Sequence, residues 1–312
     1  MNPINKGQAV WEGVLPVYKP AGFTSHDVVA KARRLLGMKR IGHTGTLDPQ
    51  VTGVLPLCLG RATRVVEYMQ ERPKEYQATL RLGIATDTED LTGTITEESE
   101  RPVDVTEMEA KAVLERFVGT ISQVPPMYSA LKVDGKRLYE LAREGKTVER
   151  KSREVSIYEL EMTGFTKMGP HVDISFRALC SKGTYIRTLC VDIGRELGYP
   201  STMVKLERTM SAGISAEHCL TFEEIERHVA DGSLSERLIA TDKAIDYMPE
   251  HTVAEAKADA ALQGQRLSLS MVSPPVTDSQ PFRLYKEDKT FLGIYGRDET
   301  GAIAPIKVFL SV

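Results

Sequence analysis

The segment that most constrains this chain is a glycine-rich run of fifteen residues, Gly42 to Pro56, with the sequence GHTGTLDPQVTGVLP. Its three glycines permit positive φ and a close backbone approach to a ligand. Pro49 restrains the preceding residue, Asp48, to an extended conformation. A single acid among such small, turn-forming residues is aimed by the backbone, so the run predicts a functional carboxylate. Taken alone, the loop also fits a surface turn that happens to contain an aspartate.

Three further blocks follow a recognisable order along the chain: Lys19–Ser25 (KPAGFTS), Val124–Lys132 (VPPMYSALK) and Lys182–Leu189 (KGTYIRTL). Together with the glycine-rich run and Gly60–Arg64, they resemble the tRNA pseudouridine synthases of the TruB type, which isomerise a uridine in the T-arm of tRNA. The resemblance covers roughly residues 10 to 215. It departs from the family pattern over Leu206–Ser215, where the family usually places the glycine one position earlier and an aromatic residue after it.

The resemblance implies three catalytic residues. Asp48 is the reacting carboxylate, and the sequence leaves open whether it acts as a nucleophile at the ribose or as a base on the sugar. Arg187 pairs with Asp48, because an opposite charge nearby favours the ionised carboxylate and fixes its direction. Tyr76 offers an aromatic face on which the extruded uracil stacks, and a phenol for proton transfer.

The resemblance also implies contacts to the target nucleotide and support for the loop. His43 occupies the space that the flipped-out base leaves, and Tyr185 and Leu206 contact the nucleotide. Lys19 and Pro20 brace the catalytic loop and take no part in the chemistry. The isomerisation breaks one bond and makes another without net redox change, so we expect no cofactor and no metal. Without the motif context, each of these residues is explained by ordinary packing or turn formation.

Periodicity and capping signals predict an α+β fold. Strands are expected at Gly13–Tyr18, Tyr76–Leu82, Val155–Thr163 and His171–Cys180, and helices at Thr24–Leu36, Thr106–Val118 and Tyr185–Leu197. In the second helix, the buried face is expected to carry Met108, Ala112, Leu114 and Phe117. Strands and helices do not alternate strictly, which favours a largely antiparallel mixed sheet with helices packed on it. The pseudouridine synthase fold that the resemblance implies has this architecture.

We expect a catalytic domain over residues 1–248 and a smaller unit over residues 249–312, joined near Met248–Glu250. The smaller unit resembles the PUA-like RNA-binding barrel of the family. Its strands are expected at Arg283–Lys286, Phe291–Tyr295 and Ala302–Phe309. An insertion at about residues 125–153 combines basic and aromatic residues, which suits a segment that grips RNA. In the family this region forms a mobile clamp.

The formal net charge of −3 argues against a generic nucleic-acid binder, but the charge is unevenly distributed. Residues 1–75 carry eleven Lys and Arg against six Asp and Glu, and residues 132–153 carry eight against four. Residues 85–115 carry two basic and ten acidic groups, and residues 217–262 carry four and eleven. We therefore expect the acidic groups to lie away from the site and the basic ones to orient a polyanion.

No apolar run has the length of a membrane span, and the N-terminus lacks a signal-peptide core, so we expect a cytoplasmic protein. The four cysteines show no Cys-x-x-Cys pairing and are expected to be buried free thiols. We expect a monomer that binds the T-arm stem-loop of tRNA.

Two alternatives belong to other classes of protein. One is a non-catalytic RNA-binding or tRNA-folding protein, against which the presence of Asp48, Tyr76 and Arg187 counts. The other is a phosphate-handling enzyme with Gly42–Gly53 as an anion cradle, although the run lacks the Gly-x-x-x-x-Gly-Lys-[Ser/Thr] pattern.

Overall fold

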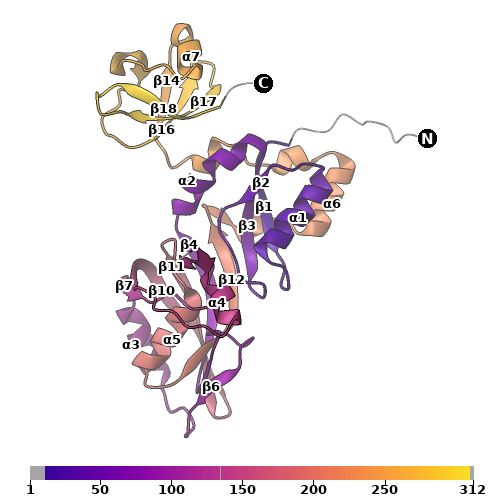
Figure 1. Ribbon diagram of the computed structural model, residues 1–312, viewed down its shortest axis with the longest axis vertical. Coiled ribbons are helices and arrows are strands. Elements are labelled where there is room, and N and C mark those ends of the chain that lie inside the picture. Colours follow the sequence, from indigo (N-terminus) through magenta and orange to yellow (C-terminus); the bar gives the residue numbers. More distant parts are fainter. Residues whose placement is uncertain (1–10, 134, 310–312) are drawn as a thin grey trace, which may run out of the picture.

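The computed structural model describes residues 11–133 and 135–309, and this part of the chain forms an elongated α+β molecule (Figure 1). Its main feature is a mixed sheet that has nine strands within the described residues. Seven of them lie side by side in the order β1 (Gly13–Lys19), β3 (Thr52–Leu59), β12 (Ser201–Ser211), β4 (Lys74–Leu82), β11 (His171–Cys180), β10 (Arg153–Met168) and β7 (Gly119–Gln123). The short strands β2 (Ile41–His43) and β13 (Ile214–Ser215) pair with β3 and β12.

The pairings along this order are antiparallel except for the one between β3 and β12. The largely antiparallel mixed sheet that the sequence predicts is therefore confirmed. The parallel contact is short and joins Thr52 and Gly53 to Glu207 and Arg208. Gly53 has a φ of 109°, and a Cβ there would lie 2.2 Å from the Arg208 carbonyl oxygen, so only glycine fits this crossing.

Two pairs of helices cover the two halves of the sheet (Figure 1). Helices α1 (Ser25–Leu36) and α6 (Phe222–Asp231) pack on β1 and β3, whereas α3 (Glu107–Arg116) and α5 (Ile186–Glu196) pack on β4, β11 and β10. Helix α1 begins at the predicted capping box between Thr24 and Asp27 and ends at Gly37, whose φ of 63° is left-handed.

The expected buried face of α3 is wrong. Ala110, Val113 and Leu114 are the buried residues, whereas Met108 is 79% exposed and Ala112 is also exposed. Positions 110, 113 and 114 share one side of an α-helix, and this side lies on the sheet. Of the four residues predicted for the buried face, only Leu114 is buried and Phe117 is half-buried, because the predicted face began at Met108 and the observed one begins at Ala110.

The free cysteines follow the prediction in three of four cases. Cys58, Cys180 and Cys190 are buried in the sheet and in α5, but Cys219 is partly exposed. Burial raises the pKa of the Cys180 thiol to about 11 and that of Cys58 to about 12, which keeps both protonated and unreactive at neutral pH.

A second sheet of five strands forms the C-terminal unit, with the order β15 (Val272–Ser273), β14 (Glu250–Val253), β16 (Phe282–Lys286), β17 (Phe291–Arg297) and β18 (Ile303–Val308). Helix α7 (Glu255–Leu262) packs on this sheet. The three strands predicted here are confirmed, with ends that differ by at most two residues.

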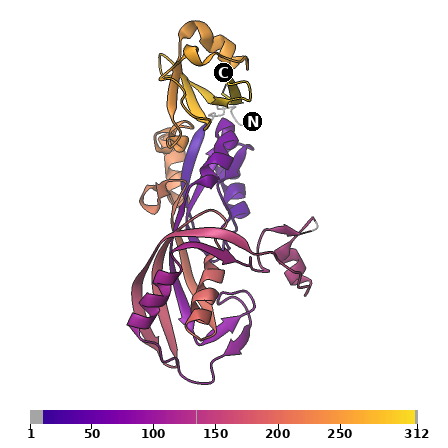
Figure 2. The ribbon, with the colours of Figure 1, turned by 90° about the vertical axis from the view of Figure 1, so that its left-hand side faces the viewer.

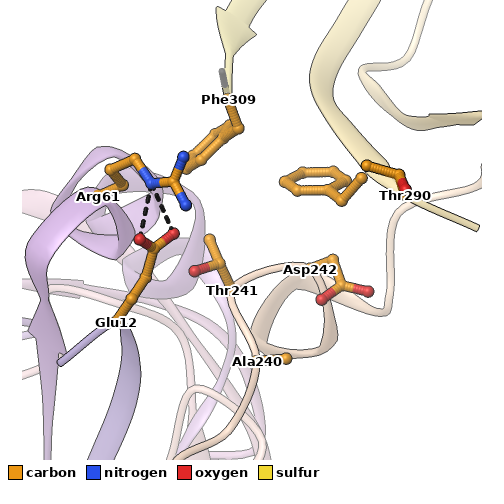
Figure 3. A pocket seen from close by; sticks show the side chains of 8 residues that line it. Glu12, Arg61, Ala240, Thr241, Asp242, Thr290 and Phe309 are labelled. Atoms are coloured by element: carbon orange, nitrogen blue, oxygen red, sulfur yellow. Dashed lines mark hydrogen bonds and ion pairs between the residues drawn. The ribbon is translucent and has the colours of Figure 1, made fainter. Parts of the chain in front are cut away.

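The two units share an apolar cluster. Ile294 and Phe309 of the C-terminal unit are buried together with Val14, Val65 and Met248 of the main body. A pocket of about 300 Å³ lies at the same junction and is lined by Glu12, Arg61, Ala240, Thr241, Asp242, Thr290, Phe291 and Phe309 (Figure 3). The C-terminal unit is thus packed against the body rather than tethered to it.

The basic insertion contains β8 (Lys132–Val133), β9 (Lys136–Arg137) and α4 (Leu138–Arg143), and it projects from the body (Figure 2). Two other small elements lie near the sheet: helix α2 (Val66–Glu71), and the hairpin of β5 (Ile84–Thr86) and β6 (Ile95–Glu98). Within the described ranges, the helices lack the length and apolar character that a membrane crossing requires.

Candidate active site

The catalytic loop connects β2 to β3 and is anchored on both sides of Asp48. Leu47 and Val51 are buried in the core, and the Leu47 N–H donates to the Ser25 hydroxyl oxygen at 2.9 Å. The Val51 N–H donates to the Asp48 carbonyl oxygen at 3.1 Å and closes a tight turn. Because its neighbours are fixed in the core, Asp48 is held at the surface of the loop with a constrained direction.

Lys19 and Pro20 support this loop from the end of β1. The Lys19 side chain is fully buried, and its Nζ donates to the Pro49 carbonyl oxygen at 2.9 Å and to the Pro20 carbonyl oxygen at 3.0 Å. Burial lowers the pKa of Lys19 to about 8, although the nearby Asp48 charge acts in the opposite direction. The lysine thus connects the Lys-Pro turn to the residue that follows Asp48.

Arg187, in the first turn of α5, lies against Asp48. Its Nε is 2.9 Å from the Asp48 Oδ2, and its side chain is 6% exposed, compared with 41% for Asp48. The other two guanidinium nitrogens donate to the carbonyl oxygens of Thr88 and Tyr128, each at 2.8 Å. All three nitrogens of Arg187 are therefore bonded, and three separate segments set its position.

The pKa of Asp48 is raised above the usual value for an aspartate. Burial of the carboxyl group is the main cause, and the Asp90 charge adds to it. The Arg187 and Lys19 charges lower the pKa but do not outweigh the burial. The Asp48 side chain is still 41% exposed. One side of its carboxyl group is thus desolvated by the protein, and the other side can be reached by a substrate.

The acidic segment after β5 is close to the site, which corrects the expectation that it lies elsewhere. Thr88 binds Arg187 through its carbonyl oxygen, and Asp90 acts on Asp48 through its charge. Glu89 has a φ of 63°, and its carboxylate accepts a hydrogen bond from Thr188, the residue after Arg187, at 2.7 Å. Charge counts along a sequence could not show this, because the β5–β6 hairpin folds back beside α5.

Tyr76 lies in β4, between Ala178 of β11 and Arg208 of β12. It is 7% exposed and belongs to the same apolar cluster as Leu47 and Val51, which flank Asp48. Burial raises the pKa of the Tyr76 phenol, and the guanidinium of Arg208 partly opposes this effect. The sheet thus brings Tyr76 beside the catalytic loop.

Tyr185 and Leu206 lie on elements that border the same region. Tyr185 immediately precedes α5, and its backbone N–H and C=O are both bonded to the buried Gln123 side-chain amide, at 3.1 and 3.2 Å. Leu206 is partly buried in β12, opposite Ala78 of β4.

His43, at the end of β2, is part of a different set of contacts. Its Nδ1 accepts the Gly45 N–H at 3.3 Å, and its ring lies 5.9 Å from the ring of His26. Burial is the main reason that the pKa of His43 is lowered. A largely neutral imidazole therefore lies beside the catalytic loop at neutral pH. His43 is not part of the ion pair between Asp48 and Arg187.

Comparison with known proteins agrees with this arrangement along almost the whole chain. Residues 33–186 match the model of the TruB family pseudouridylate synthase N-terminal domain. Residues 187–246 match the tRNA pseudouridylate synthase B C-terminal domain, and residues 249–309 match the model described as pseudouridine synthase II TruB, C-terminal. The chain belongs to the TruB family of pseudouridylate synthases.

Individual relatives show the same relationship. The tRNA pseudouridine synthase B of Bacillus licheniformis is 43% identical over 304 residues, which are 96% of this chain and 98% of the relative. That of Geobacillus thermodenitrificans is 44% identical over 302 residues, 96% of this chain and 99% of the relative. Among solved structures, a crystal structure of a Cbf5-Nop10-Gar1 complex contains a chain with a TM-score of 0.75 and 26% identity, covering 96% of this chain and 86% of that chain.

As a member of the TruB family, the protein is an isomerase.

Two residues that support the site, Arg208 and Gln123, were not predicted from the sequence. Arg208 is 1% exposed and donates to the carbonyl oxygens of Val54 and Gly45, and Gln123 fixes the backbone of Tyr185. The one available signal for Arg208 was its place in the Leu206–Ser215 block, which departs from the family pattern. No local signal marks Gln123, because its partner lies 62 residues away.

Proposed function

We propose that this TruB-family isomerase converts uridine 55 in the T-arm of tRNA to pseudouridine, with Asp48 as the reacting carboxylate. The observation that carries the proposal is the ion pair between Asp48 and the fully bonded Arg187. A carboxylate oriented in this way, with its other side accessible, fits either attack at the ribose C1′ or removal of a proton from the sugar.

The reaction needs a closed pocket in which the freed uracil is retained. In the proposal the target nucleotide is flipped out of the T-arm, His43 fills the space it leaves, and its base stacks on Tyr76. Tyr185 and Leu206 border the nucleotide, while Lys19 and Pro20 keep Pro49 and hence the catalytic loop in place. Asp48, oriented by Arg187, acts on the sugar, and the Tyr76 phenol serves in proton transfer.

The proposed division of the chain follows the two sheets. Residues 1–248 form the catalytic domain, with the insertion at about residues 125–153 as a clamp over the RNA. Residues 249–312 form a PUA-like unit that binds the rest of the tRNA; residues 1–10, 134 and 310–312 lie outside the described residues. We propose that the enzyme acts as a monomer in the cytoplasm and requires no cofactor.

The decisive experiment is to incubate the purified protein with a T-arm hairpin and with full-length tRNA, and to map pseudouridine by chemical modification and primer extension. We expect modification at position 55 in both RNAs. A matched hairpin with cytidine at this position should remain unmodified. Binding of either uridine RNA without the appearance of pseudouridine would instead identify a non-catalytic tRNA-binding protein.

A further inference from the structure

A buried arginine behind the catalytic loop lacks the acidic partner that such a residue usually has. Arg208 is 1% exposed, and within residues 11–133 and 135–309 no carboxylate forms an ion pair with its guanidinium. Two buried lysines, Lys19 and Lys74, are close enough for the Arg208 charge to lower their pKa values. Burying an unpaired cation is costly, so its retention calls for a specific role.

The contacts of Arg208 reach both ends of the catalytic loop. Its Nε donates to the Val54 carbonyl oxygen at 2.8 Å, and its Nη2 donates to the Gly45 carbonyl oxygen at 3.2 Å. Gly45 precedes Asp48 and Val54 follows it, so one guanidinium spans the loop that presents the carboxylate. The Arg208 backbone also pairs with Gly53, which fixes the arginine relative to the same loop.

Arg208 also faces Tyr76. The two residues are directly opposite each other in the β4–β12 pairing, and the Arg208 charge lowers the pKa of the Tyr76 phenol. The nearby Cys180 of β11 and the Asp48 carboxylate raise the pKa of this hydroxyl group, whereas Arg208 lowers it. Of these three groups, only Arg208 carries a positive charge, so it is the one that stabilises negative charge on the Tyr76 oxygen.

We propose that Arg208 is a positioning residue that holds Asp48 and Tyr76 toward the same nucleotide, by fixing the two ends of the catalytic loop with its guanidinium from a position directly opposite Tyr76 in the β4–β12 pairing. This inference rests on the proposed function, because it assigns a residue to that reaction. The planar fork of arginine can bind both carbonyl oxygens at once and keep its charge beside Tyr76, whereas a lysine ammonium at the same place cannot reproduce these directions. Arg208 acts through Tyr76 and the loop, and not on the substrate.

The kinetic test is Arg208→Lys, measured in single turnover on saturating T-arm hairpin. We expect the rate constant to fall about 10²-fold, since small displacements of reacting groups have effects of this size, with RNA affinity within about threefold of wild type. Combined with Tyr76→Phe, the substitution should cost less than the product of the two single losses. The matched control is Arg177→Lys, which alters an arginine on the same sheet whose partners are Glu75, Glu159 and Glu161. A rate within threefold of wild type for Arg208→Lys would overturn the proposal.

A second test needs no catalysis and separates this inference from the proposed function. The Tyr76 phenol is titrated by NMR in protein with ¹³C-labelled tyrosine, and Tyr76→Phe identifies its signal. In Arg208→Lys we expect titration at higher pH than in wild type, because the fork no longer faces the oxygen. An unchanged titration would exclude the contact, even if wild type makes pseudouridine. Absence of pseudouridine with a shifted titration would instead reject only the proposed function.

If Arg208→Lys does not fold, Tyr76→Phe supplies the test in a protein that keeps both the arginine and the aromatic ring. We expect the slowly exchanging side-chain Nε–H signal of Arg208 to shift when the Tyr76 hydroxyl group is removed. An unchanged signal would overturn the assignment of Arg208 to Tyr76.

Discussion

The active site and the basic insertion both contain cationic side chains, but those of the site are buried and held by fixed partners, whereas those of the insertion are exposed. Arg187 is buried, and each of its guanidinium nitrogens has one fixed partner. In the insertion, Lys132, Lys136 and Arg143 are exposed, and the contact of Lys136 with Glu144, at 3.4 Å, joins two side chains that are open to solvent. A fixed guanidinium can orient one carboxylate, whereas exposed flexible cations can follow a phosphate backbone but specify no geometry. The first kind of cation should therefore control the rate of chemistry, and the second kind affinity.

The largest effect is expected for Asp48→Asn. The substitution keeps the shape of the side chain and removes the charge that reacts, so turnover should fall below detection, a loss of at least about 10⁴-fold. The tRNA affinity should stay within about twofold, because Asp48 is not one of the phosphate-binding cations. Single-turnover rates and filter-binding affinities measure the two quantities. Residual turnover within tenfold of wild type would remove Asp48 from its proposed role.

A smaller loss of about 10²- to 10³-fold in rate is expected for Arg187→Lys. An ammonium group keeps the charge but cannot bind Asp48 and the carbonyl oxygens of Thr88 and Tyr128 at the same time. Arg195→Lys is the matched control, since this arginine belongs to the same helix and its side chain is 75% exposed. We expect the control to behave as wild type in the same single-turnover assay. Equal activity of the two variants would mean that the fixed geometry of Arg187 does not matter.

Neutralising the insertion should affect binding and spare chemistry. Replacing four exposed cations by glutamine removes several charges that can bind phosphates; the residues are Lys132, Lys136, Arg143 and Lys151. Affinity for tRNA should fall roughly 10²- to 10³-fold at low salt, and the slope of log Kd against log salt should decrease by about 0.7–0.9 for each phosphate that is no longer neutralised. The rate at saturating RNA should change by less than about threefold.

The control for the insertion variant is a protein in which four exposed cations far from the insertion are replaced in the same way. They are Arg101, Lys111, Arg116 and Lys167. If both variants lose affinity equally, the insertion binds RNA only through overall charge. A loss of rate at saturating RNA would show that the insertion also helps to set Arg187, through the Tyr128 carbonyl oxygen.

The smallest effect is expected for removal of residues 249–312. Affinity for full-length tRNA should fall ten- to a hundredfold if the unit binds a few phosphates, roughly 1–3 kcal/mol. A T-arm hairpin should show almost no change in kcat or KM. The deletion uncovers Val14, Val65 and Met248, so circular dichroism and thermal melting must show that the truncated protein is folded. A collapse of kcat on the hairpin with a folded protein would mean that the C-terminal unit shapes the active site.

Elements with local signals were predicted well from the sequence. Helix α1 begins at the Thr24–Asp27 capping box and ends at Gly37, because both signals act through neighbouring backbone groups. Strand β11 has the predicted bounds, since its alternating burial follows from the period of a strand. The buried face of α3 was wrong, because periodicity alone does not show which side of a helix meets the sheet.

The candidate site divides in a similar way. The sequence singled out Asp48, Tyr76 and Arg187 because they lie in, or align with, recognisable motifs. It missed the acidic hairpin beside α5, and it missed the role of Arg208 at the crossing of β3 and β12. In each case the decisive partner is a backbone carbonyl oxygen or a residue distant in sequence. Every residue has a carbonyl group, so residue types cannot show which of them will accept a hydrogen bond.

The sequence by itself determined the family, the α+β architecture and the loop that presents Asp48, because glycines, prolines and capping residues act on the chain nearest to them. Only the tertiary structure decided how that carboxylate is held. The Asp48–Arg187 pair forms where α5 meets the loop, and Arg208 reaches Gly45 and Val54 because β12 runs beside β3. The desolvation that raises the pKa of Asp48 likewise arises when distant segments pack around it, and it is absent from any one of those segments alone.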